Sequence, residues 1–132
     1  MDPRTHLQAD PGLCGTVLEL DEGSARVALE TTGPMAVDSH ELVHGGFIFG
    51  LADYAAMLAV NDPNVVLGAA ETRFLKPVRV GERIIASARI VDAKDRKREV
   101  RVEAAVRSKK VFEGTFTCFV LERHVLEGVG SK

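Results

Sequence analysis

The sequence predicts an α+β domain in which one long helix packs on a curved antiparallel sheet of about five to six strands. Residues 45–61 are apolar almost without interruption, which is typical of a helix buried on most of its circumference. Several shorter segments alternate apolar and polar residues, as strands with one buried face do. Short polar turns separate the later segments, and such turns favour antiparallel neighbours.

Each element follows from a local signal. Residues 13–20 and 25–30 alternate on either side of the turn Asp21–Ser24, which predicts a hairpin. The helix begins at a glycine pair and ends at Asn61-Asp62-Pro63. Residues 65–75 predict a strand in which Gly68 lets a ligand or backbone pass close. Segments 84–91, 99–106 and 111–121 complete a meander, with turns predicted at 94–97 and 108–110.

Composition narrows the class of protein. The 132 residues suit a single domain over 1–132, with 1–12 and 123–132 expected at its periphery. A net charge of −2 on mixed signs gives no electrostatic case for nucleic acid or an anionic membrane as a partner. We see no apolar run of transmembrane length and no secretion signal at Met1–Arg4, so we expect a cytoplasmic protein. Cys14 and Cys118 are then expected to be reduced core residues.

The segment His40-Glu41-Leu42-Val43-His44 matches the zinc-protease pattern H-E-x-x-H. That pattern works mid-helix, where i, i+4 spacing puts both imidazoles on one face. Here Gly45 follows at once, and glycine costs a helix about 1 kcal/mol relative to alanine. Turn-forming residues 31–34 precede the motif. We therefore treat a zinc metalloprotease as a remote alternative and expect no metal.

Glycines at the start of the long helix predict a different chemistry. They leave the first backbone N–H groups uncovered, and those groups with the helix dipole suit an oxyanion or a polarised carbonyl. Asp53 is an ionisable group among alanines and leucines of the same helix. A buried carboxylate is costly unless it is paired, so Asp53 is either catalytic or makes a structural hydrogen bond.

Gly45 and Asp53 are separated by eight residues, or about 12 Å along one helix. An oxyanion donor and a catalytic acid must each lie within roughly 3 Å of the reacting group. One helix therefore cannot supply both to one site. If both are catalytic, the acid of one chain meets the amide of another, which a two-fold dimer arranges twice.

Several motifs together resemble the hot-dog fold thioesterases, specifically those of the phenylacetate-pathway type. The resemblance covers residues 13–122 and rests on His44-Gly45-Gly46, with Asp53 nine residues after the histidine. It continues with Arg73-Phe74-Leu75-Lys76-Pro77 followed by Gly81-Glu82, and with Lys110–Thr115 opening the last strand. Each motif alone is weak, but their order and spacing are specific to the family.

The resemblance implies hydrolysis of an acyl-CoA thioester to free acid and CoA. The amide matching Gly45 polarises the thioester carbonyl, and the acid matching Asp53, from the second subunit, acts as nucleophile or general base. His44 matches the histidine that orients the loop or approaches the thioester, or it is structural. The family also implies homodimers, often paired into tetramers, with no cofactor beyond the CoA of the substrate.

The expected substrate-binding residues come partly from departures from the family pattern. Asp38 and Glu41 stand where the family often has asparagine and glycine, and His40 is a possible polar substitute near the site. Gly46 continues the glycine pair. The resemblance places CoA phosphates near the third strand and the last hairpin turn, which selects Arg73, Ser108 and Lys109; each of these is alternatively a solvated surface residue.

Functions of other classes remain open. The chain is alternatively a non-catalytic acyl-CoA-binding module, a sensor, if Asp53 is structural and the changes at Asp38 and Glu41 abolish activity. A hot-dog hydratase is less favoured, because its usual His–acid signature is absent from the sequence. The acyl group itself is not specified by the sequence.

Overall fold

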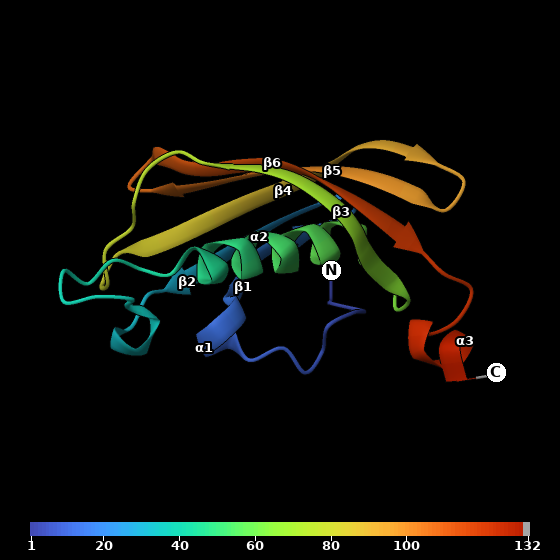
Figure 1. The fold of residues 1–132 in the computed structure, drawn as a ribbon. Helices are drawn as coiled ribbons and strands as arrows, with labels where there is room; N and C mark the ends of the chain where they lie inside the picture. Colours follow the sequence, from blue (N-terminus) through green and yellow to red (C-terminus); the bar gives the residue numbers. More distant parts are fainter. Residues whose placement is uncertain (131–132) are drawn as a thin grey trace.

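The computed structural model describes residues 1–130 and places one long helix beneath a curved, six-stranded antiparallel sheet (Figure 1). Strands follow the order β1-β2-β4-β5-β6-β3 across this sheet. The elements are α1 (Pro11–Cys14), β1 (Thr16–Asp21), β2 (Ser24–Glu30), η1 (Gly33–Met35), α2 (Gly45–Val60), β3 (Val65–Phe74), β4 (Arg83–Lys94), β5 (Lys97–Val106), β6 (Lys109–Val120) and α3 (Val125–Gly130). The predicted α+β class, with a central helix wrapped by a curved sheet, is confirmed.

Helix α2 forms the centre of the core. Its buried side chains are Ile48, Leu51, Ala52, Ala55, Ala56, Met57, Leu58 and Ala59. The many alanines let the sheet approach the helix closely, while Phe112 and Phe116 of β6 fill the remaining space without exposure. The helix ends at Asn61, which takes the left-handed conformation (φ 52°, ψ 42°). Its backbone N–H donates a hydrogen bond to the carbonyl of Met57.

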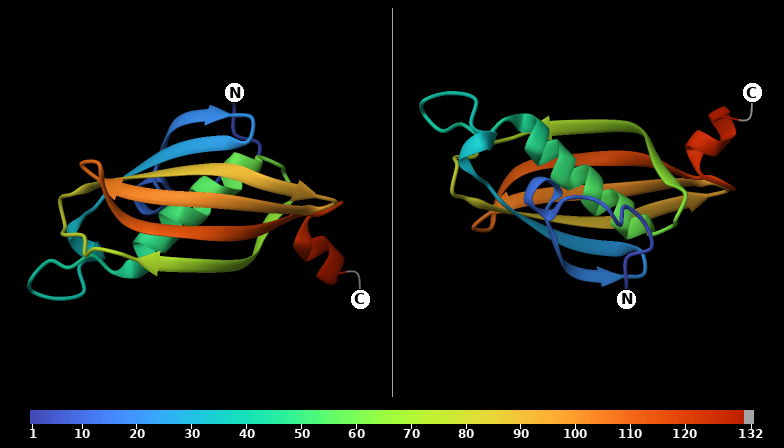
Figure 2. Two further views of the ribbon diagram at one scale, coloured as in Figure 1. Left: turned by 90° about the horizontal axis from the view of Figure 1, so that it is seen from above. Right: turned by 90° about the horizontal axis from the view of Figure 1, so that it is seen from below.

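The N-terminal segment, expected at the periphery, crosses the face of α2 that points away from the sheet (Figure 2, right). Asn61 holds it: the N–H of Arg4 donates to Asn61 Oδ1 at 2.7 Å, and Asn61 Nδ2 donates to the carbonyl of Asp2 at 3.1 Å. The His6 ring lies 6.4 Å from that of Tyr54. Of the C-terminal segment expected at the periphery, residues 131–132 lie outside the described residues.

Some predicted element boundaries were wrong, and β4 and β5 run closer to their common turn than the predicted ends at 91 and 99. The predicted strand from residue 13 starts only at Thr16, because Asp10 caps the short helix α1 by accepting a hydrogen bond from Gly12 N at 2.7 Å. The turn between β5 and β6 is Arg107-Ser108 rather than 108–110, and both residues have positive φ (49° and 70°), as a tight hairpin turn requires.

Strand β3 lies at an edge of the sheet, where β6 is its neighbour on one side (Figure 2). Its register shifts between Leu67 and Ala69, and Gly68 occupies this bulge because a Cβ there would overlap the ring of Phe119. The bulge changes which residues of β3 face the helix. Within residues 1–130, no helix is both long and apolar enough to cross a membrane.

Candidate active site at the start of the long helix

His44 caps the N-terminus of α2. Its backbone is extended (φ −60°, ψ 130°), and its ring Nδ1 accepts a hydrogen bond from the N–H of Gly46 at 2.7 Å. A Cβ on Gly46 would lie 2.8 Å from this Nδ1, so the cap requires glycine at residue 46. Because Nδ1 accepts, the neutral ring carries its proton on Nε2, on an exposed side chain.

The amide of Gly45, the first residue of α2, has no hydrogen-bond acceptor among the described residues. It is one of the N–H groups that a helix leaves unsatisfied, at the positive end of the helix dipole. A Cβ on Gly45 would come 3.3 Å from the Phe74 ring, so glycine keeps this position open. A groove of about 200 Å³ reaches Gly45 between apolar walls that include Ile48, Phe74 and Pro77. Such a donor suits a carbonyl oxygen that gains charge.

Asp53 lies two turns further along α2. Its Oδ1 is buried and has no hydrogen-bond partner among residues that the structure describes. Burial raises the pKa of this carboxyl from 3.8 to about 6. The pKa of the buried Cys118 thiol is raised to about 12, first by burial and then by the charges of Asp53 and Glu99. Natural proteins rarely leave a buried carboxylate oxygen unpaired, so Asp53 is a candidate functional residue.

The two groups do not meet within one chain. Gly45 and Asp53 lie in one regular helix, at the separation of about 12 Å that the sequence predicts. Gly46, Gly50 and Asp53 form one stripe along α2, since positions i, i+4 and i+7 share a face. A Cβ on Gly50 would meet nothing within 4 Å, so the chain itself does not cover this part of the stripe.

The loop before α2 explains both departures from the family pattern. Asp38 Oδ1 accepts hydrogen bonds from the N–H groups of His40 and Leu42, at 3.0 and 3.2 Å. An asparagine carbonyl oxygen accepts the same two bonds, so the exchange of asparagine for aspartate preserves the turn. Glu41 has φ 66°, a conformation that glycine adopts more easily.

The geometry rejects the zinc-protease alternative. Helix α2 begins only at Gly45, so His40 and His44 lie before it and do not share a helical face. Nδ1 of His44 is already occupied by the N–H of Gly46. Within the described part of the chain, no three His, Cys, Asp or Glu side chains are grouped so as to hold a metal ion.

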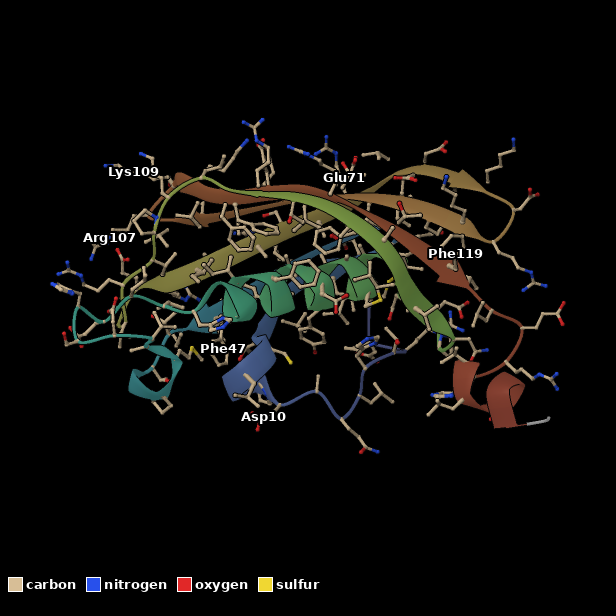
Figure 3. All side chains as sticks on the ribbon, in the orientation of Figure 1. Asp10, Phe47, Glu71, Arg107, Lys109 and Phe119 are labelled. Atoms are coloured by element: carbon tan, nitrogen blue, oxygen red, sulfur yellow. The ribbon has the colours of Figure 1, made fainter. Side chains whose placement is uncertain are left out.

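Arg73 is placed away from the helix. Phe74 faces Gly45, so its neighbour Arg73 points to the convex face of the sheet, where it stands opposite Glu113 in the register. Figure 3 shows Glu71 on this convex face. Glu71 lies two residues before Arg73 in β3, after the bulge, so the two side chains point to the same side of the sheet.

Lys109 lies instead at the end of the molecule where α2 begins (Figure 3), and Ser108 precedes it in the β5–β6 turn. Their neighbour Lys110 contacts the carboxylates of Glu103 and Glu113, so it belongs to a surface charge network. Arg79 and Arg107 were not predicted as site residues, but they line a groove together with Asp38 and His40. The bridge between Leu42 and Arg79 brings Arg79 to this loop, together with hydrogen bonds from Val43 N to the carbonyl of Val78 and from Val80 N to that of Glu41.

Comparisons with solved structures agree with the fold. An uncharacterized protein from Pyrococcus horikoshii is 52% identical, with a TM-score of 0.95 over 96% of this chain and 97% of that one. A mutant of the phenylacetic acid degradation protein PaaI from Thermus thermophilus is 35% identical, with a TM-score of 0.77 over 85% of this chain and 100% of that one.

Curated relatives are longer proteins. A methylthioribose-1-phosphate isomerase of Aquifex aeolicus is 51% identical over 92% of this chain, which spans 27% of that protein. The transcription factor FapR of Caldanaerobacter subterraneus subsp. tengcongensis is 29% identical over 86% of this chain, which spans 57% of it. Residues 40–111, from the loop before α2 to the start of β6, match the Thioesterase superfamily. With this match and the fold described above, the chain belongs to the Thioesterase superfamily and has the hot-dog fold.

Proposed function

We propose that the protein hydrolyses an acyl-CoA thioester at a site formed by two copies of the chain. The observation that carries this proposal is Asp53, whose buried Oδ1 has no partner among the described residues. Membership in the Thioesterase superfamily and the similarity to PaaI support the reaction class. The substrate carbonyl accepts a hydrogen bond from Gly45 N–H of one copy and faces Asp53 of the other.

The chemistry follows from these two groups. Attack on the thioester carbonyl moves negative charge onto its oxygen, and the Gly45 amide stabilises that charge at the helix terminus. Asp53 in its ionised form either attacks the carbonyl itself or removes a proton from an attacking water. His44 fixes the amide of Gly46 and so shapes the turn that presents Gly45. The products are the free acid and CoA.

A homodimer is part of this proposal. Edge strand β3 is ten residues long, and its backbone groups that point away from β6 have no strand partner among the described residues; exposed edges of this length are usually covered. The stripe of Gly46, Gly50 and Asp53 is open at Gly50, where a Cβ would meet nothing within 4 Å. A two-fold axis beside the middle of α2 would bring each Gly45 to the other Asp53 and form two equal sites.

A second function is favoured by one comparison. Most of this chain aligns with the transcription factor FapR, although it spans only 57% of that protein. In this alternative the domain binds an acyl-CoA without hydrolysing it, and Asp53 serves binding or structure.

A thiol-release assay distinguishes the two functions. Acetyl, medium-chain, long-chain and aromatic CoA esters are tested with the wild type and with Asp53→Asn and Asp53→Ala. We expect turnover of at least one ester and a loss of at least roughly a hundredfold in kcat for Asp53→Asn, the effect of losing an acid–base group. Asp92→Asn, an exposed position of β4, is the matched control and should keep full activity.

Full activity of Asp53→Asn would remove this carboxylate from the mechanism. Absence of turnover on every ester, combined with saturable CoA binding by calorimetry, would establish the binding function instead.

A further inference from the structure

Residues 36–43, which we call the pre-helix hairpin, project from the end of the molecule where α2 begins (Figure 1). Ala36 and Val43 form an antiparallel bridge, and the N–H of Val37 donates to the carbonyl of Leu42 at 2.9 Å. Val43 is buried and anchors the base of the hairpin, whereas the apolar side chain of Val37 is 52% exposed. The hairpin is therefore a structured projection with an uncovered apolar side chain.

A groove of about 530 Å³ lies at the opposite end of the molecule. We call it the N-terminal groove; residues 4–8, 63–66 and 124–125 line it. Its N-terminal wall is held by the two hydrogen bonds to Asn61 described above and by Thr5, which is only 5% exposed. Leu7, in the same wall, is 74% exposed. The groove is thus a preformed surface that also presents apolar area to solvent.

Both features lie beside edge strand β3, but at its two ends. Figure 2 shows the hairpin near the end of β3 and α3 near its beginning, and Figure 1 shows both on the helix side of the sheet. The two-fold axis of the proposed dimer, beside the middle of α2, exchanges these two ends. The pre-helix hairpin of each copy then approaches the N-terminal groove of the other.

The rise of the helix gives the same correspondence. In the proposed dimer, Asp53 of one copy is level with Gly45 of the other. Asn61, which holds the N-terminal wall, follows Asp53 by eight residues, or about 12 Å along the axis. It is therefore level with a point about 12 Å before Gly45 of the other copy, which is the region of the pre-helix hairpin.

The charges of the two surfaces are complementary. The hairpin carries Asp38 and Glu41, whereas Arg4, His6 and His124 line the groove and none of its lining residues is acidic. Asp38 already accepts two backbone N–H groups of its own loop, so the exposed Glu41 is the carboxylate that a neighbouring chain can meet. Opposite charges across an interface select the partner and fix its register.

We infer that the pre-helix hairpin of each copy docks in the N-terminal groove of the other, with Glu41 beside Arg4 of the second copy. The inference rests on the proposed function, because it requires the two-copy site, and it deepens that proposal. The hairpin leads directly into His44 and Gly45, so the N-terminal segment of one subunit holds the turn that presents the amide of the other.

Charge reversal tests this docking. Arg4→Glu and Glu41→Arg are prepared separately and mixed, and native mass spectrometry counts the dimers after subunit exchange. Each variant alone has like charges at both contacts of its dimer, whereas the mixed dimer has opposite charges at both. Random pairing gives about half mixed dimers, and we expect at least roughly three quarters, since an exposed ion pair contributes modestly at each of two contacts. Arg89→Glu and Asp92→Arg, exposed positions of β4, are the matched controls and should pair at random.

Turnover in the same samples separates docking from catalysis. We expect kcat to fall severalfold in each single variant and to recover in the mixture, because the turn that presents Gly45 is again held in place. Random pairing of the two variants, with turnover by the wild type, would overturn the docking while leaving hydrolysis intact. A preference for mixed dimers without turnover of any ester would support the docking and refute hydrolysis. A monomeric wild type would refute both the docking and the two-copy site. Far-UV circular dichroism confirms that each variant folds.

Discussion

Ionisation of the Asp53 carboxyl should destabilise the folded protein at the pH where the proposed hydrolysis requires the ionised form. Burial raises the pKa of this group from 3.8 to about 6. Between these values the folded state binds more protons than the unfolded state, so the free energy of unfolding falls as pH rises through this window. A shift of about two units, at 1.36 kcal/mol each, corresponds to a loss of about 3 kcal/mol that is complete above pH 6.

Substitution of Asp53 by asparagine removes this loss, because the amide resembles the protonated acid and never ionises. We expect wild type and Asp53→Asn to have similar stability near pH 4, and the variant to be more stable by about 3 kcal/mol at pH 7. Hydrolysis should show the opposite preference, with kcat of the wild type rising through about pH 6 as Asp53 ionises.

Urea denaturation followed by circular dichroism from pH 4 to pH 8 measures the difference. Protomer concentration is held fixed, since association contributes to apparent stability. Two stability curves that run parallel across this range would refute the reasoning, because the difference must open between pH 4 and pH 6.

Two further substitutions test the turn before α2. His44→Ala removes the cap on Gly46 N and should lower the free energy of unfolding by about 1 kcal/mol, read from thermal denaturation; an unchanged melting temperature would show that this cap contributes nothing. Glu41→Gly relieves the positive φ of 66° and should raise stability by up to about 1 kcal/mol in the same assay, whereas a loss of stability would show that the glutamate side chain makes a compensating contact.

Long, strongly patterned elements were predictable from the sequence. Helix α2 was expected over 45–61 and spans Gly45–Val60, because glycines, an unbroken apolar run and Asn-Asp-Pro mark its two ends. The short helix α1 was missed although Asp10-Pro11 is a typical helix start, since the alternation that follows favours a strand. The Arg107-Ser108 turn was misplaced because neither residue is the glycine or asparagine that usually marks a positive φ.

The site was only partly predictable. His44, Gly45 and Gly46 are adjacent in sequence, so a local pattern suffices to place them at one helix terminus. The side of the sheet on which Arg73 lies depends on the bulge at Gly68, which shifts the alternation of β3 by one residue. Arg79 reaches the loop through a bridge to Leu42, and nothing local to either residue signals that contact.

The position of both catalytic candidates on one helix has a mechanical consequence. In the proposed dimer each α2 supplies its amide to one site and its carboxylate to the other. Since α2 is a single uninterrupted helix of 16 residues packed against the sheet, it moves as a rigid rod. Any displacement of one rod changes the spacing in both sites together. The two sites are therefore expected to open and close together, and a change that disrupts the spacing in one should disrupt it in the other.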